Sequence, residues 1–298
     1  MMIKKFKKKN AFKPHHGSKI KEDRKHILSS KSGFFLQEAY KSLRTNINFS
    51  LADQEGCKVI LVTSAMQSEG KSVTALNLAI SLAQTDKKIL IIDCDLRRPK
   101  LGRLLNISAD MGMSNLLMDA SIVDVTILHH EAHGIDLILS GDIPPNPSEL
   151  LSSGRMQKVM EILRARYDYI ILDSPPVDMV IDAVVLAPQC DGVLFVVRAN
   201  SSERGAVMYA MEQLEYAKAR VLGFVFNGMT GETASGYGKY RYKRYGRYGY
   251  YRRYGRYNYS HAYYQGYSQG YNQGYNYGYG YGSGHNPGNP SEVPPHQM

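Results

Sequence analysis

The sequence predicts an α/β fold: a doubly wound, mostly parallel sheet with helices on both faces. Three observations predict it: short apolar segments that recur along the chain, helix-like segments between them, and a Gly-Lys-Ser turn after the first apolar segment. Strands that are buried on both faces of a parallel sheet are continuously apolar, and the helices between them cover the two faces. Ligands in such sheets bind beyond the carboxyl ends of the strands.

The predicted elements define one globular domain over residues 32–231. The expected strands are the apolar segments 58–64, 88–93, 136–140, 169–173, 192–197 and 222–227. The expected helices, with apolar residues at spacings of three and four, are 72–85, 148–166 and 203–219. Residues 1–31 are expected to form a flexible basic arm. Residues 232–298 are rich in Tyr, Gly and Arg and lack the aliphatic residues of a core, which predicts a disordered tail.

Charge is distributed unevenly along the chain. Residues 1–31 carry a net charge of +9 and residues 237–298 carry +7, so the overall +10 leaves −6 for the middle. Basic ends on an acidic domain favour contact with anionic partners or with the domain itself.

Several classes of protein are excluded. The basic start of the chain is not followed by the apolar run of a signal peptide, and no stretch is long and apolar enough to span a membrane. Cys57, Cys94 and Cys190 are odd in number and scattered, without a CxxC pair, which argues against disulfides and zinc and for a reducing, cytoplasmic compartment. Cys94 stands between two acids. A redox role for it is a weaker interpretation than that of an ordinary buried thiol.

A candidate phosphate loop follows the first expected strand. In such a loop, backbone N–H groups at a helix N-terminus bind phosphate, Lys71 reaches the β and γ phosphates, and Ser72 ligates Mg²⁺. Ala65 stands where the usual pattern has its first glycine. The expected nucleotide-binding residues here are Ser68, Glu69, Gly70, Lys71, Ser72 and Val73. The alternative is an ordinary helix start with a solvent-facing lysine.

Carboxylates end two other expected strands. Asp93 and Asp95 follow the segment 88–93, and Asp173 ends the segment 169–173. At the sheet edge that holds the phosphate loop, carboxylates can hold Mg²⁺ or accept a hydroxyl proton. A single aspartate at a strand end is more often a turn former or a helix cap, but three beside a phosphate loop favour a catalytic site.

The segments SAMQSEGKS, ILIIDCDLRRP and IILDSPP resemble the Walker A, A′ and B motifs of the bacterial tyrosine kinases that regulate capsule and exopolysaccharide synthesis. The likeness covers about residues 30–230. Related septum-positioning and partition ATPases usually carry a second lysine early in the phosphate loop, and this sequence has none between Ser64 and Lys71. The resemblance implies a P-loop kinase that uses ATP and Mg²⁺ to phosphorylate protein tyrosines.

By this resemblance Lys71 and Ser72 bind the nucleotide and Mg²⁺, Asp93 and Asp95 serve the metal and accept a proton, and Asp173 orients the metal's water shell. Spacing does not decide which of Asp93 and Asp95 is the base. Asn227 resembles an asparagine that contacts adenine in related ATPases, although a lone asparagine in a turn is an equal alternative.

The segment 34–50 places Glu38, Lys41 and Arg44 along one helical face. It resembles the family's Glu-x-x-Arg-x-x-Arg motif, which assembles subunits into a ring, with Lys41 at a position usually held by Arg. The alternative is a solvated face with intrahelical ion pairs. The resemblance implies a homo-oligomer in which one subunit phosphorylates a neighbour's tail. The expected sites, taken from the 18 of 23 tyrosines that lie between 237 and 284, are Tyr257, Tyr259, Tyr263, Tyr264, Tyr267, Tyr271, Tyr275, Tyr277, Tyr279 and Tyr281.

The resemblance also implies a membrane-anchored activator protein, through which the cytoplasmic kinase associates with the membrane. Two other functions compete. The tail could bind nucleic acid through stacked tyrosines and arginines, but its arginines end at Arg256 while tyrosines continue to Tyr281, which makes nucleic acid the weaker interpretation. The third is a membrane-cycling ATPase, which would hydrolyse nucleotide without forming phosphotyrosine.

Overall fold

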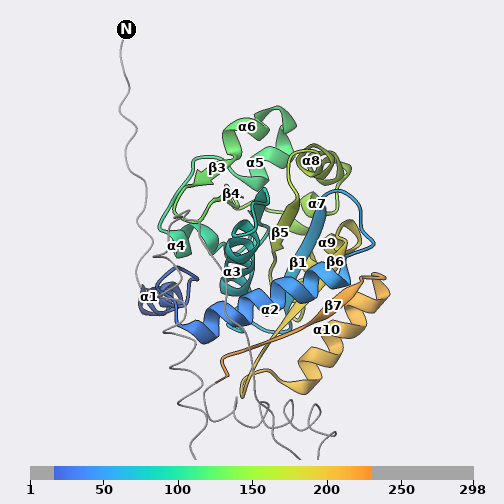
Figure 1. The fold of residues 1–298 in the computed structure, drawn as a ribbon. Coiled ribbons are helices and arrows are strands. Elements are labelled where there is room, and N and C mark those ends of the chain that lie inside the picture. Colours follow the sequence, from blue (N-terminus) through green and yellow to red (C-terminus); the bar gives the residue numbers. More distant parts are fainter. Residues whose placement is uncertain (1–16, 230–298) are drawn as a thin grey trace, which may run out of the picture. The chain divides into compact units, whose positions relative to one another are not determined.

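The computed structural model of the chain describes residues 17–229 (Figure 1). The expected tail, with all its tyrosines, and residues 1–16 lie outside the described residues. The strands of the described part form one sheet in the order β3-β4-β2-β5-β1-β6-β7. The strands are β1 Lys58–Ser64, β2 Ile89–Asp93, β3 Leu128–His130, β4 Ile135–Ile138, β5 Tyr169–Asp173, β6 Gly192–Arg198 and β7 Val221–Asn227. Only β3 is antiparallel to its neighbour, so the predicted, mostly parallel α/β fold is confirmed.

Helices connect the strands. The α-helices are α1 Gly17–Lys25, α2 Phe34–Ser50, α3 Lys71–Ala83, α4 Leu101–Leu105, α5 Met113–Met118, α6 Val123–Thr126, α7 Pro147–Leu151, α8 Gly154–Arg164, α9 Asp182–Leu186 and α10 Arg204–Tyr216. Two short 3₁₀ turns are η1 Ala120–Ile122 and η2 Ala187–Gln189.

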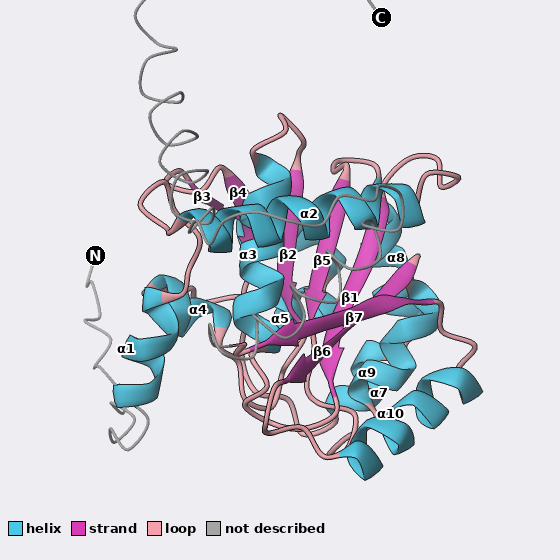
Figure 2. Ribbon diagram, turned by 60° about the horizontal axis from the view of Figure 1, so that its bottom comes forward, coloured by secondary structure: helices cyan, strands magenta, loops and turns pink. Residues whose placement is uncertain are grey.

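The sheet is buried on both faces because successive side chains of a strand point to opposite sides. In β1, Ile60 and Val62 pack with α2, α3 and α4, whereas Val59 and Leu61 pack with α5, α8, α9 and α10. Figure 2 shows α2 lying across one face of the central strands. This two-sided burial explains why the central strands are continuously apolar, and it leaves the carboxyl ends of the strands as the place for a site.

Two local differences from the predicted elements have simple causes. Strand β3 was not expected, because Leu128–His130 is only three residues long and two of them are histidines. The predicted helix 148–166 is two helices, α7 and α8, because Ser153 adopts an extended conformation and caps α8 by accepting a hydrogen bond from the Met156 N–H.

The expectation of a flexible arm through residue 31 does not hold for residues 17–31. Helix α1 is followed by Leu28, whose side chain is buried and whose N–H donates to Asn77 Oδ1 over 2.7 Å. The Asn77 Nδ2 donates in turn to the His26 carbonyl. Asn77 is buried on α3, so the N-terminal segment is held by a buried amide, a contact that its charged composition does not reveal. In the described part of the chain, no helix combines the length and the apolar character needed to cross a membrane.

Candidate active site

The candidate site lies where strands β1, β2 and β5 end. The register of the parallel pairs aligns Asp93 of β2 with Asp173 of β5, and Asp173 with Val62 of β1. Strand β1 runs on to Ser64 and into the loop that leads to α3. The topology therefore brings the phosphate loop and the strand-end carboxylates to one edge, as the sequence predicts.

The phosphate loop owes its shape to its backbone conformation. Gly70 precedes α3 in the left-handed region, with φ of +97°, and Ser68 is also left-handed at +68°. Ala65, which replaces the usual first glycine, is not among the described residues with positive φ and is fully buried in the core. An alanine is therefore tolerated there, while glycine is required at position 70. Val73 follows in the first turn of α3, where its N–H is one of the free donors of a helix N-terminus.

Neighbouring elements hold the loop in this shape. The buried Glu69 carboxylate accepts the Met66 N–H at 2.8 Å and also accepts a hydrogen bond from the Ser202 hydroxyl. Arg198 donates to the Ser68 carbonyl at 3.0 Å, and Asn227 Nδ2 donates to the Glu69 carbonyl at 2.8 Å. The side chains of Glu69 and Asn227 thus lie at the loop as expected, and in this structure each of them forms hydrogen bonds that shape it.

Lys71 is the buried cation of the site. Its Nζ lies 3.7 Å from Asp95 Oδ2, and both side chains are about 95% buried. A lysine this deeply buried is stable only beside negative charge, so the alternative of a solvent-facing lysine does not hold.

Asp93 organises the loop that carries Asp95. Its Oδ1 accepts the Asp95 N–H at 3.2 Å, and its Oδ2 accepts the N–H groups of Lys100 and Leu101 at 3.0 Å each. Burial and the adjacent Asp173 carboxylate raise the pKa of Asp93, against the lowering effect of the hydrogen bonds from Leu101 and Lys100. The structure therefore gives Asp93 a clear positioning role, whereas Asp95 faces the lysine directly.

Asp173 and Ser72 are buried side by side without well-formed hydrogen bonds. Neither carboxylate oxygen of Asp173 nor the Ser72 Oγ has a partner with full hydrogen-bond geometry in the described chain, although the adjacent Ser72 hydroxyl helps to lower the pKa of Asp173. Burial raises the pKa of Asp173, against the lowering influence of the Lys71 ammonium. A buried carboxylate without donors is costly unless a cation joins it. A hydroxyl and a carboxylate are ligands that suit Mg²⁺, so these residues fit the ion that the resemblance implies.

The protein does not by itself form a complete metal cage here. No group of three or more His, Cys, Asp or Glu side chains within residues 17–229 is arranged to hold a metal ion. Mg²⁺ in nucleotide sites keeps several waters and uses one or two carboxylates together with the substrate phosphates. The site thus fits a metal that arrives with a nucleotide.

Two features of the site were not predicted. Arg97 forms two hydrogen bonds to the buried Asp182 carboxylate, at 2.8 and 3.1 Å, and Asp182 also accepts the Ser148 hydroxyl. The half-buried Lys100 lies at the same edge, where its backbone N–H donates to Asp93 Oδ2. Both basic residues follow the aspartates in the segment DCDLRRPK, which was the available signal, but only the fold shows what they face.

Helix α2 carries the residues of the expected subunit interface. Lys41 Nζ pairs with Glu38 Oε1 at 2.8 Å, which is the intrahelical pairing weighed as the alternative. Arg44 donates to the Ser81 carbonyl on α3 and so ties α2 to the helix behind the phosphate loop. The three side chains lie on one side of α2, but Arg44 has a role within its own chain.

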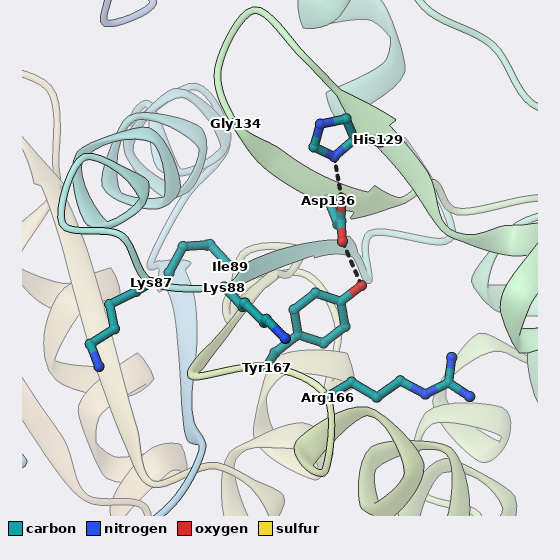
Figure 3. A pocket seen from close by; sticks show the side chains of 8 residues that line it. All are labelled: Lys87, Lys88, Ile89, His129, Gly134, Asp136, Arg166 and Tyr167. Atoms are coloured by element: carbon teal, nitrogen blue, oxygen red, sulfur yellow. Dashed lines mark hydrogen bonds and ion pairs between the residues drawn. The ribbon is translucent and has the colours of Figure 1, made fainter.

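A second hollow, of about 380 Å³, lies at the opposite edge of the sheet, near the starts of β2, β4 and β5. It is lined by Lys87, Lys88, Ile89, His129, Gly134, Asp136, Arg166 and Tyr167. Figure 3 shows the Asp136 carboxylate between His129 and the Tyr167 hydroxyl, while Lys87 and Arg166 extend in opposite directions. Lys87 and Arg166 also each form an ion pair with a neighbouring aspartate. Because Lys87 and Arg166 point apart and are paired with aspartates, these two cations do not form a joint site for an anion.

The parallel sheet, the glycine-cornered loop at the start of α3, and the buried lysine beside strand-end carboxylates define a nucleotide-binding protein of the P-loop class. A family model described as an AAA domain matches residues 45–217. The septum site-determining protein MinD of Pyrococcus horikoshii OT3, solved with Mg-ADP, shares the fold alone, at a TM-score of 0.50 and 19% identity over 60% of this chain and 76% of that one.

Closer relatives define the family. Tyrosine-protein kinase YwqD of Bacillus subtilis (strain 168) is 35% identical over 230 residues, which are 77% of this chain and 96% of the relative. The solved kinase domain of the Escherichia coli tyrosine kinase ETK superposes with a TM-score of 0.63 at 32% identity, over 74% of this chain and 80% of that one. The chain belongs to the family of bacterial tyrosine-protein kinases, which confirms the resemblance seen in its motifs.

Proposed function

We propose that the site transfers the γ-phosphoryl group of MgATP to tyrosine hydroxyls, including those of the chain's own tail between Tyr257 and Tyr281. The observation that carries this proposal is the set of unpartnered polar atoms on Ser72 and Asp173 beside the Lys71–Asp95 pair. Family membership gives the acceptor, since the relatives are named tyrosine-protein kinases.

Binding rests on the phosphate loop. The free N–H groups at the start of α3 and the Lys71 ammonium hold the phosphates, and Ser72 and Asp173 hold Mg²⁺, to which Asp93 adds a ligand directly or through water. Bound Mg²⁺ supplies charge neutralisation on the β and γ phosphates. Asn227 lies at the phosphate loop, and its likeness to the asparagine of related ATPases supports a contact with adenine.

Transfer needs positioning more than a strong base. A tyrosine hydroxyl, with a pKa of about 10, is a weak nucleophile at neutral pH. The loose transition state of phosphoryl transfer leaves a nearby carboxylate sufficient as acceptor of the phenolic proton. The tyrosine oxygen bonds to the γ phosphorus, the bond to the β-phosphate oxygen breaks, and ADP leaves. Of the two candidate bases, Asp95 is favoured, because Asp93 is engaged by three backbone N–H groups.

We further propose that transfer occurs between subunits of a ring-like homo-oligomer formed through the α2 residues Glu38, Lys41 and Arg44. The kinase would act in capsular or exopolysaccharide synthesis, together with a membrane-anchored activator protein and further protein-tyrosine substrates. Family likeness supports these steps.

The test is Lys71→Met in the full chain. With MgATP, the parent should accumulate phosphotyrosine, mapped by mass spectrometry to the tail, and the variant should form none while its circular dichroism is unchanged. Lys158→Met, a charge loss on the exposed face of α8, is the matched control. Nucleotide hydrolysis without phosphotyrosine in the parent would indicate the membrane-cycling ATPase instead.

A further inference from the structure

The ion pair between Arg97 and Asp182 joins the two loops that carry the carboxylates of the site. Arg97 lies in the loop 94–100, two residues after Asp95. Asp182 begins α9, at the far end of the loop that follows Asp173. The pair therefore links the chain around the proposed base to the chain that follows the proposed metal ligand.

The contact is two-pronged, and a third residue closes it. Arg97 Nε donates to Asp182 Oδ2 at 2.8 Å, and its Nη2 donates to Oδ1 at 3.1 Å. The same Nη2 donates to Ser148 Oγ at 3.0 Å, while the Ser148 hydroxyl donates to Asp182 Oδ1 at 2.6 Å. Two hydrogen bonds from a planar guanidinium fix direction as well as distance. This triangle holds the loop 94–100 in one orientation against α7 and α9.

Asp182 is a firm anchor for this contact. Its side chain is fully buried, and the loop before it is bonded to the end of β1. The Val177 N–H donates to the Ser64 carbonyl at 2.9 Å, and the Asp178 N–H donates to the Ala65 carbonyl at 3.1 Å. Through Asp182, Arg97 is thus tied to the place where the phosphate loop begins.

The loop 94–100 needs such an anchor, because it has no regular secondary structure. The Asp93 carboxylate binds backbone N–H groups near both ends of the loop. Between these ends, the Arg98 N–H donates to Asp95 Oδ1 at 2.9 Å, which bends the chain around Arg97. The direction in which Arg97 is held therefore bears on where the Asp95 carboxylate lies.

We propose that Arg97 is a positioning residue for the phosphoryl-transfer step and acts through Asp95. Its contacts with Asp182 and Ser148 hold the loop so that the Asp95 carboxylate meets the hydroxyl of the acceptor tyrosine. The proposal rests on the proposed kinase function, with Asp95 as the base. A displacement of about 1 Å in such a site costs on the order of a hundredfold in rate. Because the nucleotide is bound by the phosphate loop, Arg97 should affect transfer more than nucleotide binding.

The positioning role is tested by measuring phosphotyrosine formation in the full chain against the concentration of MgATP. Arg97→Met should lower the rate at saturating MgATP at least about tenfold, while the half-saturating concentration changes less than about threefold. Arg97→Lys keeps the charge and can form one of the two bonds to Asp182, so it should recover part of the rate. A parent-like rate in Arg97→Met, or a loss that saturating MgATP abolishes, would overturn the proposal.

Action through Asp95 is tested by a double-mutant cycle. Arg97→Met should slow the Asp95→Asn variant less than about threefold, because a base that is absent cannot be misplaced. If Arg97→Met slows the Asp95→Asn variant as much as it slows the parent, Arg97 does not act through Asp95.

A second variant separates loss of position from loss of stability. Arg97→Met leaves the Asp182 carboxylate buried without its cation, which destabilises the fold. The double variant Arg97→Met/Asp182→Asn removes that charge and keeps an acceptor for the Ser148 hydroxyl. Its urea midpoint should return toward that of the parent, while its rate should stay as low as that of Arg97→Met. Recovery of the rate together with the stability would show that the pair only stabilises the fold, and would overturn the proposal.

The chain offers a matched control at the opposite edge of the sheet, where the strands start. There, Arg164 pairs with Asp191 at 2.9 Å, directly before β6. Arg164→Met should lower the urea midpoint and leave the rate at saturating MgATP unchanged. Equal slowing by Arg164→Met and Arg97→Met would assign the effect to stability alone and overturn the positioning role.

Failure of this inference is distinguishable from failure of the proposed function. If Lys71→Met abolishes phosphotyrosine but Arg97→Met forms it at the parent's rate, only the role of Arg97 is overturned. If Lys71→Met forms phosphotyrosine at the parent's rate, the proposed site itself is wrong.

Discussion

Gly70 and Asn227 are fitted to each other so closely that a side chain at position 70 has no room. A Cβ atom built on Gly70 would lie 1.8 Å from Asn227 Nδ2, the atom that donates to the Glu69 carbonyl. Gly70 also adopts a left-handed φ of +97°, which residues with a Cβ rarely adopt. The last strand of the sheet, β7, thereby fixes the corner of the phosphate loop.

Gly70→Ala should therefore weaken MgATP binding by at least about tenfold, because both the strain and the displaced Asn227 distort the loop. Adding Asn227→Gly removes the overlap but not the left-handed backbone, so the double variant should recover only part of the affinity. Calorimetry with MgATP measures both effects. Parent-like affinity in Gly70→Ala would show that the loop does not need this corner.

Substitutions of Asp93 and Asp95 should have different effects: we expect Asp93 to matter for stability and Asp95 for the rate of phosphoryl transfer. Asp93→Ala leaves three backbone N–H groups without their acceptor. At about 1 kcal/mol for each lost bond, its free energy of unfolding in urea should be about 3 kcal/mol lower than that of the parent. Asp95→Asn, which keeps the shape, should lose at least about tenfold in the rate of phosphotyrosine formation. Parent-like stability of Asp93→Ala would contradict the positioning role of Asp93.

Much of the fold follows from local sequence. The strands β1, β2, β5 and β6 are continuously apolar because both faces of the sheet are covered, and this pattern fixes their positions to within about a residue. The strand-end aspartates follow from the same pattern, since parallel strands end at one edge. Strand β3 and the docking of α1 do not, because each depends on distant partners and not on its own composition.

The site was predictable where chemistry is local and hidden where it is not. Three consecutive residues, the Gly-Lys-Ser turn, are enough to predict phosphate binding. Asp182, by contrast, lies about 85 residues from its partner Arg97 and has no pattern around it, so only the packing of α9 against the loop reveals the pair.

Asp173→Asn should make the protein more stable and less active. Its two buried oxygens have no donor with full hydrogen-bond geometry in the described structure, and burial outweighs the influence of the nearby Ser72 hydroxyl and Lys71 ammonium, so the ionised carboxylate destabilises the metal-free protein. In EDTA, the free energy of unfolding of the variant should be about 1–2 kcal/mol higher than that of the parent. Its rate of phosphotyrosine formation should fall at least about tenfold. Because burial raises the pKa of Asp173, the parent loses stability as this group ionises with rising pH, so the gain should be larger at pH 8 than at pH 5.

The control for Asp173→Asn is the same comparison with Mg²⁺ and a non-hydrolysable imido analogue of ATP present. The ligand should then stabilise the parent more than the variant, which reverses or narrows the difference between them. An unchanged difference would mean that Asp173 takes no part in binding the metal and nucleotide.

The last prediction concerns assembly, and the structure shows how to test it without damaging the fold. Arg44 is bonded to the Ser81 carbonyl of α3, so Arg44→Ala should lower the free energy of unfolding by about 1 kcal/mol whether or not subunits assemble. Glu38 and Lys41 form an exposed pair worth at most about 0.5 kcal/mol. Their double alanine variant should therefore keep parent-like stability at low concentration. Light scattering should show it shifted toward monomer, with phosphorylation between molecules slowed. If the double variant has the same mass and phosphorylation rate as the parent, Glu38 and Lys41 belong to an ordinary solvated helix face. Any subunit interface would then have to lie on other surfaces.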